Sequence, residues 1–153
     1  GHIAVATSDL KKDNTGKKID IRARKFLKKS NLDYAHGTGH GVGFFLNVHE
    51  GPQSISKINK IRIKEGMILS NEPGFYKKNK FGIRIENLVY VKKQNKKLFF
   101  ENLTMAPIEK DLINYDLLTN FEKNYLFKYH LNVYSKVAKY LNSNEKKWLA
   151  SLI

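Results

Sequence analysis

The spacing of apolar residues divides the chain into a first part with strands and a last part that is helical. In the first part, Ile19, Ala23 and Leu27 recur every four residues, which predicts a helix over residues 18–30. Residues 1–10 are typical of the end of another helix. The chain therefore begins with two helical segments, which a polar turn joins.

Two short apolar segments in the middle of the chain predict strands. Residues 67–70 are apolar except for Ser70, and residues 83–91 alternate as a strand does. Turn-forming residues lie between these segments at 72–74 and 77–80. Another extended segment follows, so this region predicts a small sheet.

The last third of the chain has a helical pattern. Thr119 and Glu122 have the spacing of a capping box, which predicts that a long helix begins there. Its predicted apolar face consists of Phe121, Tyr125, Tyr129, Val133, Val137 and Leu141. A short last helix holds Trp148. Strands followed by helices predict the α+β fold class.

The excess of basic residues does not predict a nucleic-acid partner. The chain has 28 Lys and Arg against 14 Asp and Glu, a net charge of +14, which is typical of polyanion binders. However, only four of these residues are Arg, the residue whose planar fork suits bases and phosphates. The Lys are scattered in pairs, without interleaved aromatic residues. We therefore expect solvated lysines, and neither a nucleic acid nor a membrane as partner.

The chain has no Cys, which excludes disulfides and thiolate metal sites and suits a reducing cytoplasm. No apolar segment approaches the roughly 18 residues that a membrane span needs. Since the sequence starts at Gly1 without Met, we expect the true N-terminus upstream, and a signal peptide is left open.

A glycine-rich segment at 36–43 contains two histidines four residues apart, His36 and His40. Its four glycines each disfavour a helix by about 1 kcal/mol. In an extended chain His36, Thr38 and His40 lie on one face, and the missing side chains let a substrate or metal approach the backbone. Taken alone, a glycine-rich turn with incidental histidines is the simpler interpretation.

Two further segments carry candidate chemistry. His49 lies in a turn before Gly51-Pro52, where a surface turn is the simpler interpretation. Glu72 follows an apolar strand and precedes Pro73, which forces Glu72 into an extended conformation. This carboxylate is a candidate ligand or base, with a solvated hairpin residue as the alternative.

The segment 82–91 places Arg84 and Glu86 on one face of a strand. Because its flanking residues are apolar on both faces, we expect these two side chains to be covered. A covered carboxylate must be paired or bound to a metal. A structural Arg-Glu pair is the alternative.

Together, His40, Glu72 and Glu86 supply one imidazole and two carboxylates from separate segments. This oxygen-rich set suits Mn(II), Co(II) or Zn(II). Two metals about 3.5 to 4 Å apart need more ligands than these three.

Four motifs, HGTGHGVG, NVHEGP, NEPGFY and GIRIEN, follow in this order. With them the chain resembles the Xaa-Pro aminopeptidases of the pita-bread metallopeptidase family. The resemblance implies that residues 1–93 are the C-terminal part of the catalytic domain and that residues 98–153 are the C-terminal helical extension.

The same resemblance implies two metals held by two Asp, one His and two Glu. His40 and Glu72 match ligands of one metal each, and Glu86 matches the bridging ligand. His36 and His49 would face the substrate, and Arg84 would brace the cage. The two Asp are expected upstream of Gly1, so we expect the chain alone to be inactive.

The activity implied is hydrolysis of an N-terminal Xaa-Pro bond in the cytoplasm by water activated between two ions, most simply Mn(II), with Glu72 moving the proton. The resemblance also allows a homodimer. One alternative is a prolidase, which acts on dipeptides. Another is a metal-free pita-bread protein used for binding, against which the retention of all three ligands argues.

Overall fold

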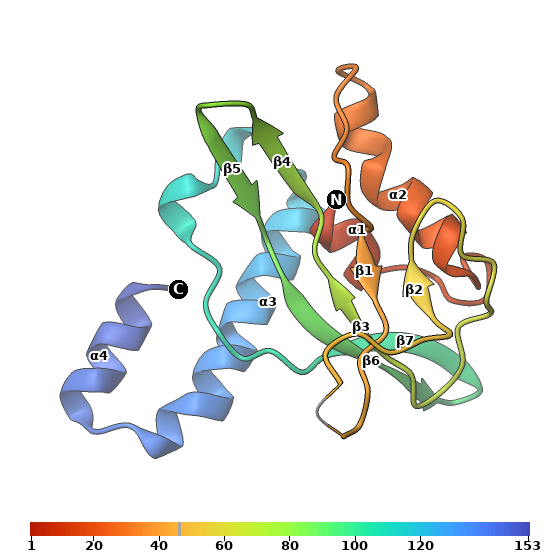
Figure 1. The fold of residues 1–153 in the computed structure, drawn as a ribbon. Helices are drawn as coiled ribbons and strands as arrows, with labels where there is room; N and C mark the ends of the chain where they lie inside the picture. The colour runs from red at the N-terminus through yellow and green to blue at the C-terminus, as the bar shows by residue number, and fades with distance from the viewer. Residues whose placement is uncertain (46) are drawn as a thin grey trace. The chain divides into compact units, whose positions relative to one another are not determined.

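The computed structural model describes residues 1–45 and 47–153, which divide into two compact units, Gly1–Thr104 and Met105–Ile153. Each unit is described by itself. Figure 1 shows that strands are confined to the first unit and that the second is helical.

Two helices open the first unit, α1 (His2–Ala6) and α2 (Gly16–Lys28), close to the predicted bounds. Ile19 and Ala23 are buried, as their spacing predicts. Helix α2 begins at a glycine because a Cβ atom at Gly16 would lie 1.7 Å from the carbonyl oxygen of Ser54. The close approach fixes the first turn of α2 against the strand that contains Ser54.

The strands form three small antiparallel sheets within the described residues. Strands β1 (Gly39–His40) and β2 (Ser54–Ile55) pair with each other. The main sheet has the order β3-β6-β7, formed by Ile68–Asn71, Asn87–Gln94 and Lys97–Asn102. A hairpin is formed by β4 (Gly74–Lys77) and β5 (Phe81–Arg84).

The β3–β6 ladder and the β4–β5 ladder share one register, and a gap separates them. Asn71 lies opposite Asn87 in the main sheet, and Gly74 lies opposite Arg84 in the hairpin. Two residues separate the ladders on each strand, so Glu72 lies opposite Glu86 and Pro73 lies opposite Ile85. The single strand predicted over 83–91 is therefore two strands, β5 and β6.

The gap between the ladders is caused by residues that lie far from Ile85 in the sequence. Pro73 has no N–H to donate across to Ile85. The carbonyl oxygen of Ile85 instead accepts a hydrogen bond from Nδ1 of His2, at 3.2 Å. The two strands part at this point, which is where the two glutamates lie.

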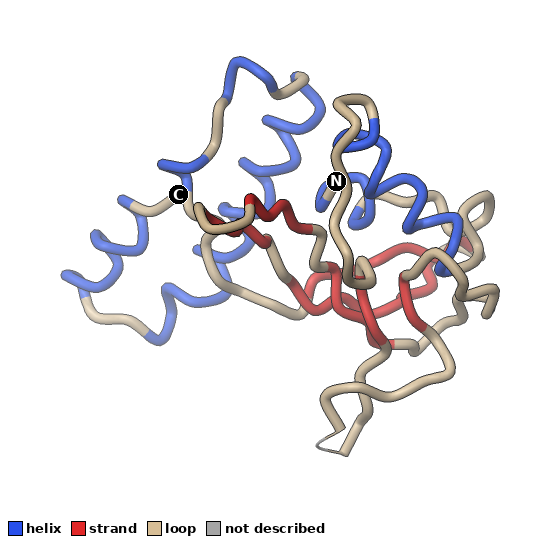
Figure 2. The backbone as a smooth tube through the Cα atoms, turned by 45° about the horizontal axis from the view of Figure 1, so that its top comes forward, coloured by secondary structure: helices blue, strands red, loops and turns tan. Residues whose placement is uncertain are grey.

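The core of the first unit lies between its helices and the main sheet, and Figure 2 shows both helices on the same side of these strands. Its buried apolar side chains come from α1, α2, β2, β3, β6, β7 and the loops between them. They are Val5, Leu10, Ile19, Ala23, Ile55, Ile63, Leu69, Val89, Val91 and Phe100.

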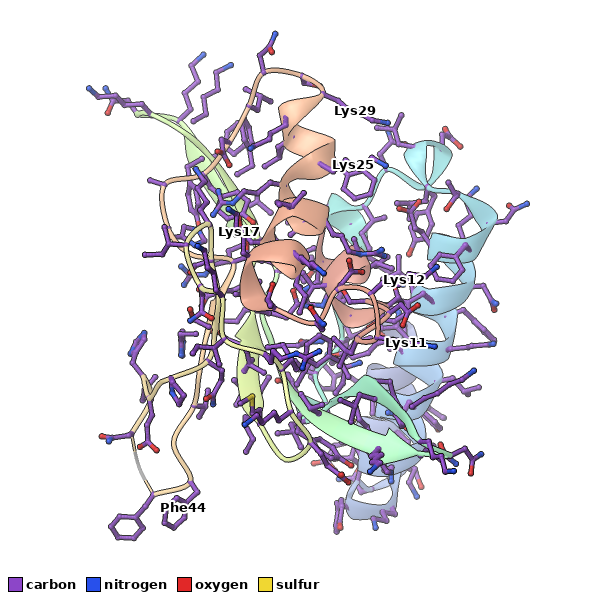
Figure 3. All side chains as sticks on the ribbon, turned by 90° about the vertical axis from the view of Figure 1, so that its right-hand side faces the viewer. Lys11, Lys12, Lys17, Lys25, Lys29 and Phe44 are labelled. Carbon is purple, nitrogen blue, oxygen red and sulfur yellow. The ribbon has the colours of Figure 1, made fainter. Side chains whose placement is uncertain are left out.

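Lysines cover the outside of this unit. Figure 3 shows Lys17 and Lys25 on α2 and Lys29 directly after its end, with Lys11 and Lys12 on the preceding loop. All five are exposed.

The second unit contains α3 (Asn120–Val137) and α4 (Ser143–Ser151), with short 3-10 turns at Lys110–Leu112, Tyr115–Leu117 and Ala138–Tyr140. The predicted capping box is confirmed, since the Thr119 side chain accepts from the backbone of Glu122 and the Glu122 side chain accepts from the backbone of Thr119.

The predicted apolar face of this helix is partly wrong. The buried residues of α3 are Leu126, Tyr129, His130 and Val133, whereas Phe121 is 61% exposed and the helix ends before Leu141. A repeat of four residues turns by more than a full turn at each step, so the predicted stripe drifts around the helix away from the buried line. Within the described ranges, no helix has the length and apolar character that crossing a bilayer requires.

Candidate active site

The site starts at His40, which β1 holds against the edge of β3. The backbone N–H of His40 donates to Oγ of Ser70 at 2.8 Å. The strands approach closely because residue 39 is glycine: a Cβ atom there would lie 2.0 Å from the Ser70 carbonyl oxygen. Nδ1 of His40 donates to the carbonyl of Gly41 at 3.0 Å, which leaves the lone pair of Nε2 free to bind a cation.

Glu72 lies beside His40, with 3.6 Å between Oε1 of Glu72 and Nε2 of His40. Its carboxylate also accepts a hydrogen bond from Oγ of Ser70 at 2.8 Å. Its backbone N–H donates to the carbonyl of Thr38, again at 2.8 Å. Ser70 therefore contacts both candidate ligands, a role that was not predicted from the sequence, although Ser70 lies two positions before Glu72 on the same strand face.

Glu86 lies opposite Glu72 and pairs with Arg84, whose Nε donates to Oε2 of Glu86 at 3.2 Å. The expectation that both side chains are covered is wrong, since the side chains of Arg84 and Glu86 are 49% and 42% exposed. The apolar residues that suggested cover, such as Val89 and Val91, pack on the opposite face of the strand. Among the described residues, no group of three metal-binding side chains is already assembled.

His36 faces the hairpin through Tyr76. Its Nδ1 donates to the carbonyl of Gly37 at 2.6 Å, so its Nε2 accepts from the Tyr76 hydroxyl at 2.8 Å. The Tyr76 hydroxyl also bonds to Arg84, and this bond, with the charge of Glu86, raises the pKa of the guanidinium. A chain of polar contacts thus runs from Glu86 to His36. A pocket of about 570 Å³ opens beside His36, Tyr76 and Arg84.

The Tyr76 ring lies over two glycines. A Cβ atom at Gly74 would come within 2.6 Å of the Tyr76 hydroxyl oxygen, and one at Gly82 would come within 2.6 Å of its ring. In the sequence, Gly74 was predicted to lie in a turn and Gly82 at the start of a strand, and no role was predicted for Tyr76. The available signal was that Gly74 lies two residues before Tyr76 and Gly82 two residues before Arg84. On one hairpin face the large side chains of Tyr76 and Arg84 therefore have glycines as neighbours.

His49 stacks on His40, with 3.9 Å between the two ring centroids. It lies on the exposed segment that follows β1, which the backbone bond from Glu50 to the carbonyl of Gly41 closes at 2.9 Å. Phe44, in the same loop, is 94% exposed and projects away from the unit (Figure 3). Thr38, which lies between the two histidines of its motif, is fully buried.

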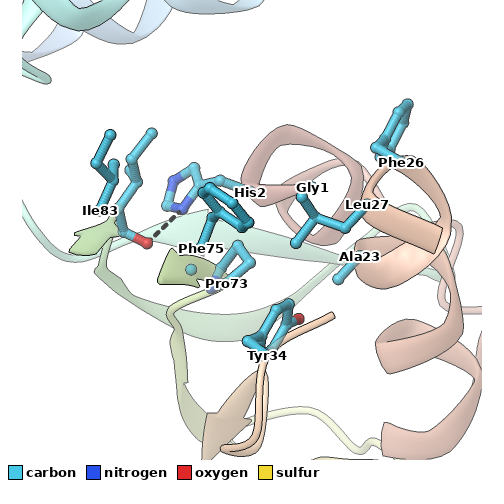
Figure 4. Close-up of a pocket in the computed structure, with 11 residues that line it drawn as sticks. Gly1, His2, Ala23, Phe26, Leu27, Tyr34, Pro73, Phe75 and Ile83 are labelled. Carbon is cyan, nitrogen blue, oxygen red and sulfur yellow. Dashed lines mark hydrogen bonds between the residues drawn. The ribbon is translucent and has the colours of Figure 1, made fainter. Parts of the chain in front are cut away.

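The other face of the hairpin is apolar. Pro73, Phe75 and Ile83 line a pocket of about 260 Å³ together with residues of α1 and α2 (Figure 4). Burial at this place lowers the pKa of His2 to about 4, so its imidazole is neutral at pH 7. The hairpin therefore separates an apolar pocket from the polar face that carries Arg84.

The donor set fits a divalent cation. Two ligand atoms that each lie about 2.1 Å from one ion are about 3.0 to 3.6 Å apart for bond angles of about 90° to 120°. The His40–Glu72 separation of 3.6 Å is at the upper end of that range. The Glu86 carboxylate lies across the strand from them and has its other oxygen, Oε1, outside the ion pair with Arg84.

Comparison with known proteins gives two family matches. The model of metallopeptidase family M24 matches residues 2–93, and the model of the C-terminal region of peptidase M24 matches residues 96–152. A probable Xaa-Pro aminopeptidase P of Laccaria bicolor is 45% identical over 162 residues, which cover 97% of this chain and 25% of that protein.

Solved structures agree with these matches. An X-prolyl aminopeptidase of Caenorhabditis elegans, described as a cytosolic enzyme with a di-nuclear active site, matches 99% of this chain with a TM-score of 0.89 and 38% identity. The prolidase of Pyrococcus furiosus matches 66% of it with a TM-score of 0.56 and 34% identity. The chain spans 26% and 28% of these two proteins, about a quarter of the relatives' length.

Proposed function

The chain belongs to metallopeptidase family M24, and we propose that it forms the C-terminal part of the active site of a two-metal Xaa-Pro aminopeptidase. Its α+β architecture is a portion of the pita-bread fold followed by C-terminal helices. In this proposal residues 1–93 belong to the catalytic domain and 98–153 form its C-terminal extension, which the matches over 2–93 and 96–152 support.

One observation carries the proposal. Ser70 joins His40 and Glu72 in a single hydrogen-bonded unit, and the strand register sets Glu86 opposite Glu72. The imidazole and the two carboxylates then lie at the same end of the main sheet. This is the chemistry of a site for hard or borderline divalent cations.

In the proposed site, His40 and Glu72 would each bind only one of the two ions, which can be the same ion at their separation of 3.6 Å, and Glu86 would be a ligand of both. The ions are Mn(II), with Co(II) or Zn(II) as alternatives of the same coordination chemistry. When bound, they polarise the scissile carbonyl and activate water. The full-length protein, meaning this chain together with the upstream part that its relatives have, would supply two Asp ligands.

The side chains of this chain have separate tasks in the reaction. Glu72 accepts the proton of the attacking water on Oε2, because Oε1 already accepts from Ser70. His49, stacked on His40, lies where it can guide the same proton toward the leaving nitrogen. Arg84 holds Glu86, and His36 lines the substrate side of the polar chain through Tyr76.

The proposed substrates are peptides with proline in the second position. The bond before proline has no N–H, so the site must bind the substrate without a donor at that nitrogen. The alternative, a prolidase, is less well supported, since the match to the Pyrococcus prolidase covers 66% of the chain and the match to the Caenorhabditis aminopeptidase covers 99%. We further propose a cytoplasmic location and a homodimer.

The deciding experiment uses the full-length protein with Mn(II). We expect two bound metal ions per chain and release of the first residue from Xaa-Pro-Yaa peptides at a higher kcat/KM than from Xaa-Pro dipeptides. A preference for dipeptides would establish the prolidase instead. A full-length protein that binds no divalent metal would support the metal-free binding protein.

A further inference from the structure

A second polar cluster lies behind the site, between α2 and the loop that leads to His40. At its centre is Arg24, which is only 1% exposed. Its Nε donates to both carboxylate oxygens of Asp20, each at 2.9 Å. The Tyr34 ring covers the guanidinium, with 3.8 Å from Cζ of Arg24 to the ring centroid.

The remaining nitrogens of Arg24 bind the loop itself. Nη1 donates to Oδ1 of Asp33 at 2.5 Å and to the carbonyl of Tyr34 at 2.7 Å. Nη2 donates to the carbonyl of His36 at 2.7 Å. Although burial raises the pKa of Asp33, hydrogen bonds from Lys57 and Arg24 hold it well below its usual range. One planar cation therefore fixes three successive points of the loop.

Thr38 connects the same cluster to the candidate metal ligands. Its buried hydroxyl donates to Oδ1 of Asp20 at 2.6 Å and bonds to the hydroxyl of Tyr34 at 2.5 Å. Its carbonyl accepts the backbone N–H of Glu72 at 2.8 Å. Two residues further on is His40. The cluster thus reaches both Glu72 and the histidine loop through the backbone of a single residue.

Stability alone is a weak explanation for such a cluster. A buried ion pair costs several kcal/mol per ion to desolvate, and an apolar replacement of similar volume is often as stable. What the planar guanidinium adds is geometry, because its fork fixes several acceptors at once. Outer partners that orient metal ligands typically change metal affinity or activity by about 10- to 100-fold when removed.

We propose that Asp20, Arg24 and Thr38 are positioning residues that set the His36–His40 loop against Glu72. The proposal rests on the proposed function, since Glu72 and His40 are taken as metal ligands. Helix α2 is then part of the site although none of its side chains reaches the ligands. The loop that carries His40 is thus held in place by Asp20 and Arg24, which lie four residues apart on α2.

The test compares two substitutions of Thr38 in the full-length protein. Thr38→Val keeps the shape and removes the hydroxyl, while Asp20 stays paired with Arg24; Thr38→Ser keeps the hydroxyl and serves as the matched control. We expect Thr38→Val to weaken Mn(II) binding and to lower kcat by about 10- to 100-fold. Thr38→Ser should stay within about threefold of wild type, since the hydroxyl that bonds to Asp20 is retained.

A readout independent of activity is hydrogen exchange of the segment around Glu72, measured by mass spectrometry on the full-length protein. Thr38→Val should speed exchange there by about tenfold, the effect of losing roughly one hydrogen bond, with the segment 97–102 unchanged. Arg24→Lys should act in the same direction and more strongly, because an ammonium cannot replace the fork.

The outcomes separate this proposal from the proposed function. If the full-length protein does not cleave Xaa-Pro bonds, the proposed function fails, while metal affinity and exchange still decide the positioning role. Equal metal affinity and equal exchange near Glu72 in Thr38→Val and wild type would overturn the proposal. So would faster exchange spread evenly over the whole unit, which would show a merely structural role.

Discussion

Glu72 and Glu86 lie opposite each other in one strand register, yet their surroundings differ. Glu72 is held by the Ser70 hydroxyl and, through its backbone N–H, by the carbonyl of Thr38, and the His40 imidazole lies 3.6 Å away. Glu86 is held by the exposed guanidinium of Arg84. The difference follows from position: β3 belongs to the packed sheet, whereas Arg84 ends the exposed hairpin.

This contrast indicates a site that is rigid on one side and open on the other. Hydrogen bonds from buried groups fix Glu72 before any cation arrives, and outer contacts of this kind orient metal ligands. An exposed ion pair such as Arg84–Glu86 contributes only about 0 to 1 kcal/mol, so a divalent cation can compete for the carboxylate. The Glu86 side is therefore where further ligands would complete the cage.

The largest expected effect concerns the chain by itself. Three candidate ligands carry two negative charges, too few to balance two divalent ions, so the 153-residue chain should neither bind two metals nor release residues from Xaa-Pro-Yaa peptides. Metal analysis after gel filtration and a peptide release assay measure this, with the full-length protein as control. Turnover with two bound ions would contradict the ligand count.

Next in size is Glu86→Gln in the full-length protein. The amide keeps the shape but bridges two cations poorly. Removal of a residue that only orients a metal ligand typically lowers activity by about 10- to 100-fold, and we expect a larger loss here. Because Glu86 is exposed, the fold should be unaffected, with a change in unfolding free energy within about 0.5 kcal/mol. Activity within tenfold of wild type at saturating Mn(II) would show that Glu86 is not a bridging ligand.

The sequence predicted much of this arrangement, and its failures have physical reasons. Helix α2 follows from the spacing of Ile19 and Ala23, and the start of α3 follows from Thr119 and Glu122. The prediction of one long strand over 83–91 is wrong because the gap at residue 85 arises from Pro73 on the partner strand, which is a tertiary effect. Local patterns carry no information about which residue will lie opposite.

The candidate site was only partly visible in sequence for a similar reason. The motifs identify His40, Glu72 and Glu86, yet they do not show that Ser70 binds two of them. The exposure of Glu86 was also not predicted, since apolar neighbours in the sequence do not show whether other residues pack over the opposite face of the strand. Contacts of these kinds depend on how β1, β3 and the hairpin meet in space.

A smaller effect is expected on the rigid side of the site. Ser70→Ala leaves the partly buried N–H of His40 without its acceptor and Glu72 without a donor, which should lower the local stability of β1 by about 1 to 3 kcal/mol. Hydrogen exchange of residues 39–42 in the full-length protein measures it. Ser54→Ala on neighbouring β2 is the matched control, expected within about 0.5 kcal/mol of wild type. Equal behaviour of both variants would remove the asymmetry between the two glutamates.

The smallest stability change is expected on the open side, for Arg84→Ala. The Arg84–Glu86 pair is half exposed, so its loss should change the local stability of β5 by less than about 1 kcal/mol, and added salt should shrink the difference further. Hydrogen exchange of residues 81–84, at low and high salt, measures this, with Arg84→Lys as the charge-preserving control. Activity should nevertheless fall, by about 10- to 100-fold, because Glu86 loses the group that orients it. A stability loss as large as that of Ser70→Ala would mean that the hairpin side is as firmly built as the Glu72 side, and the contrast between the two carboxylates would then have no physical basis.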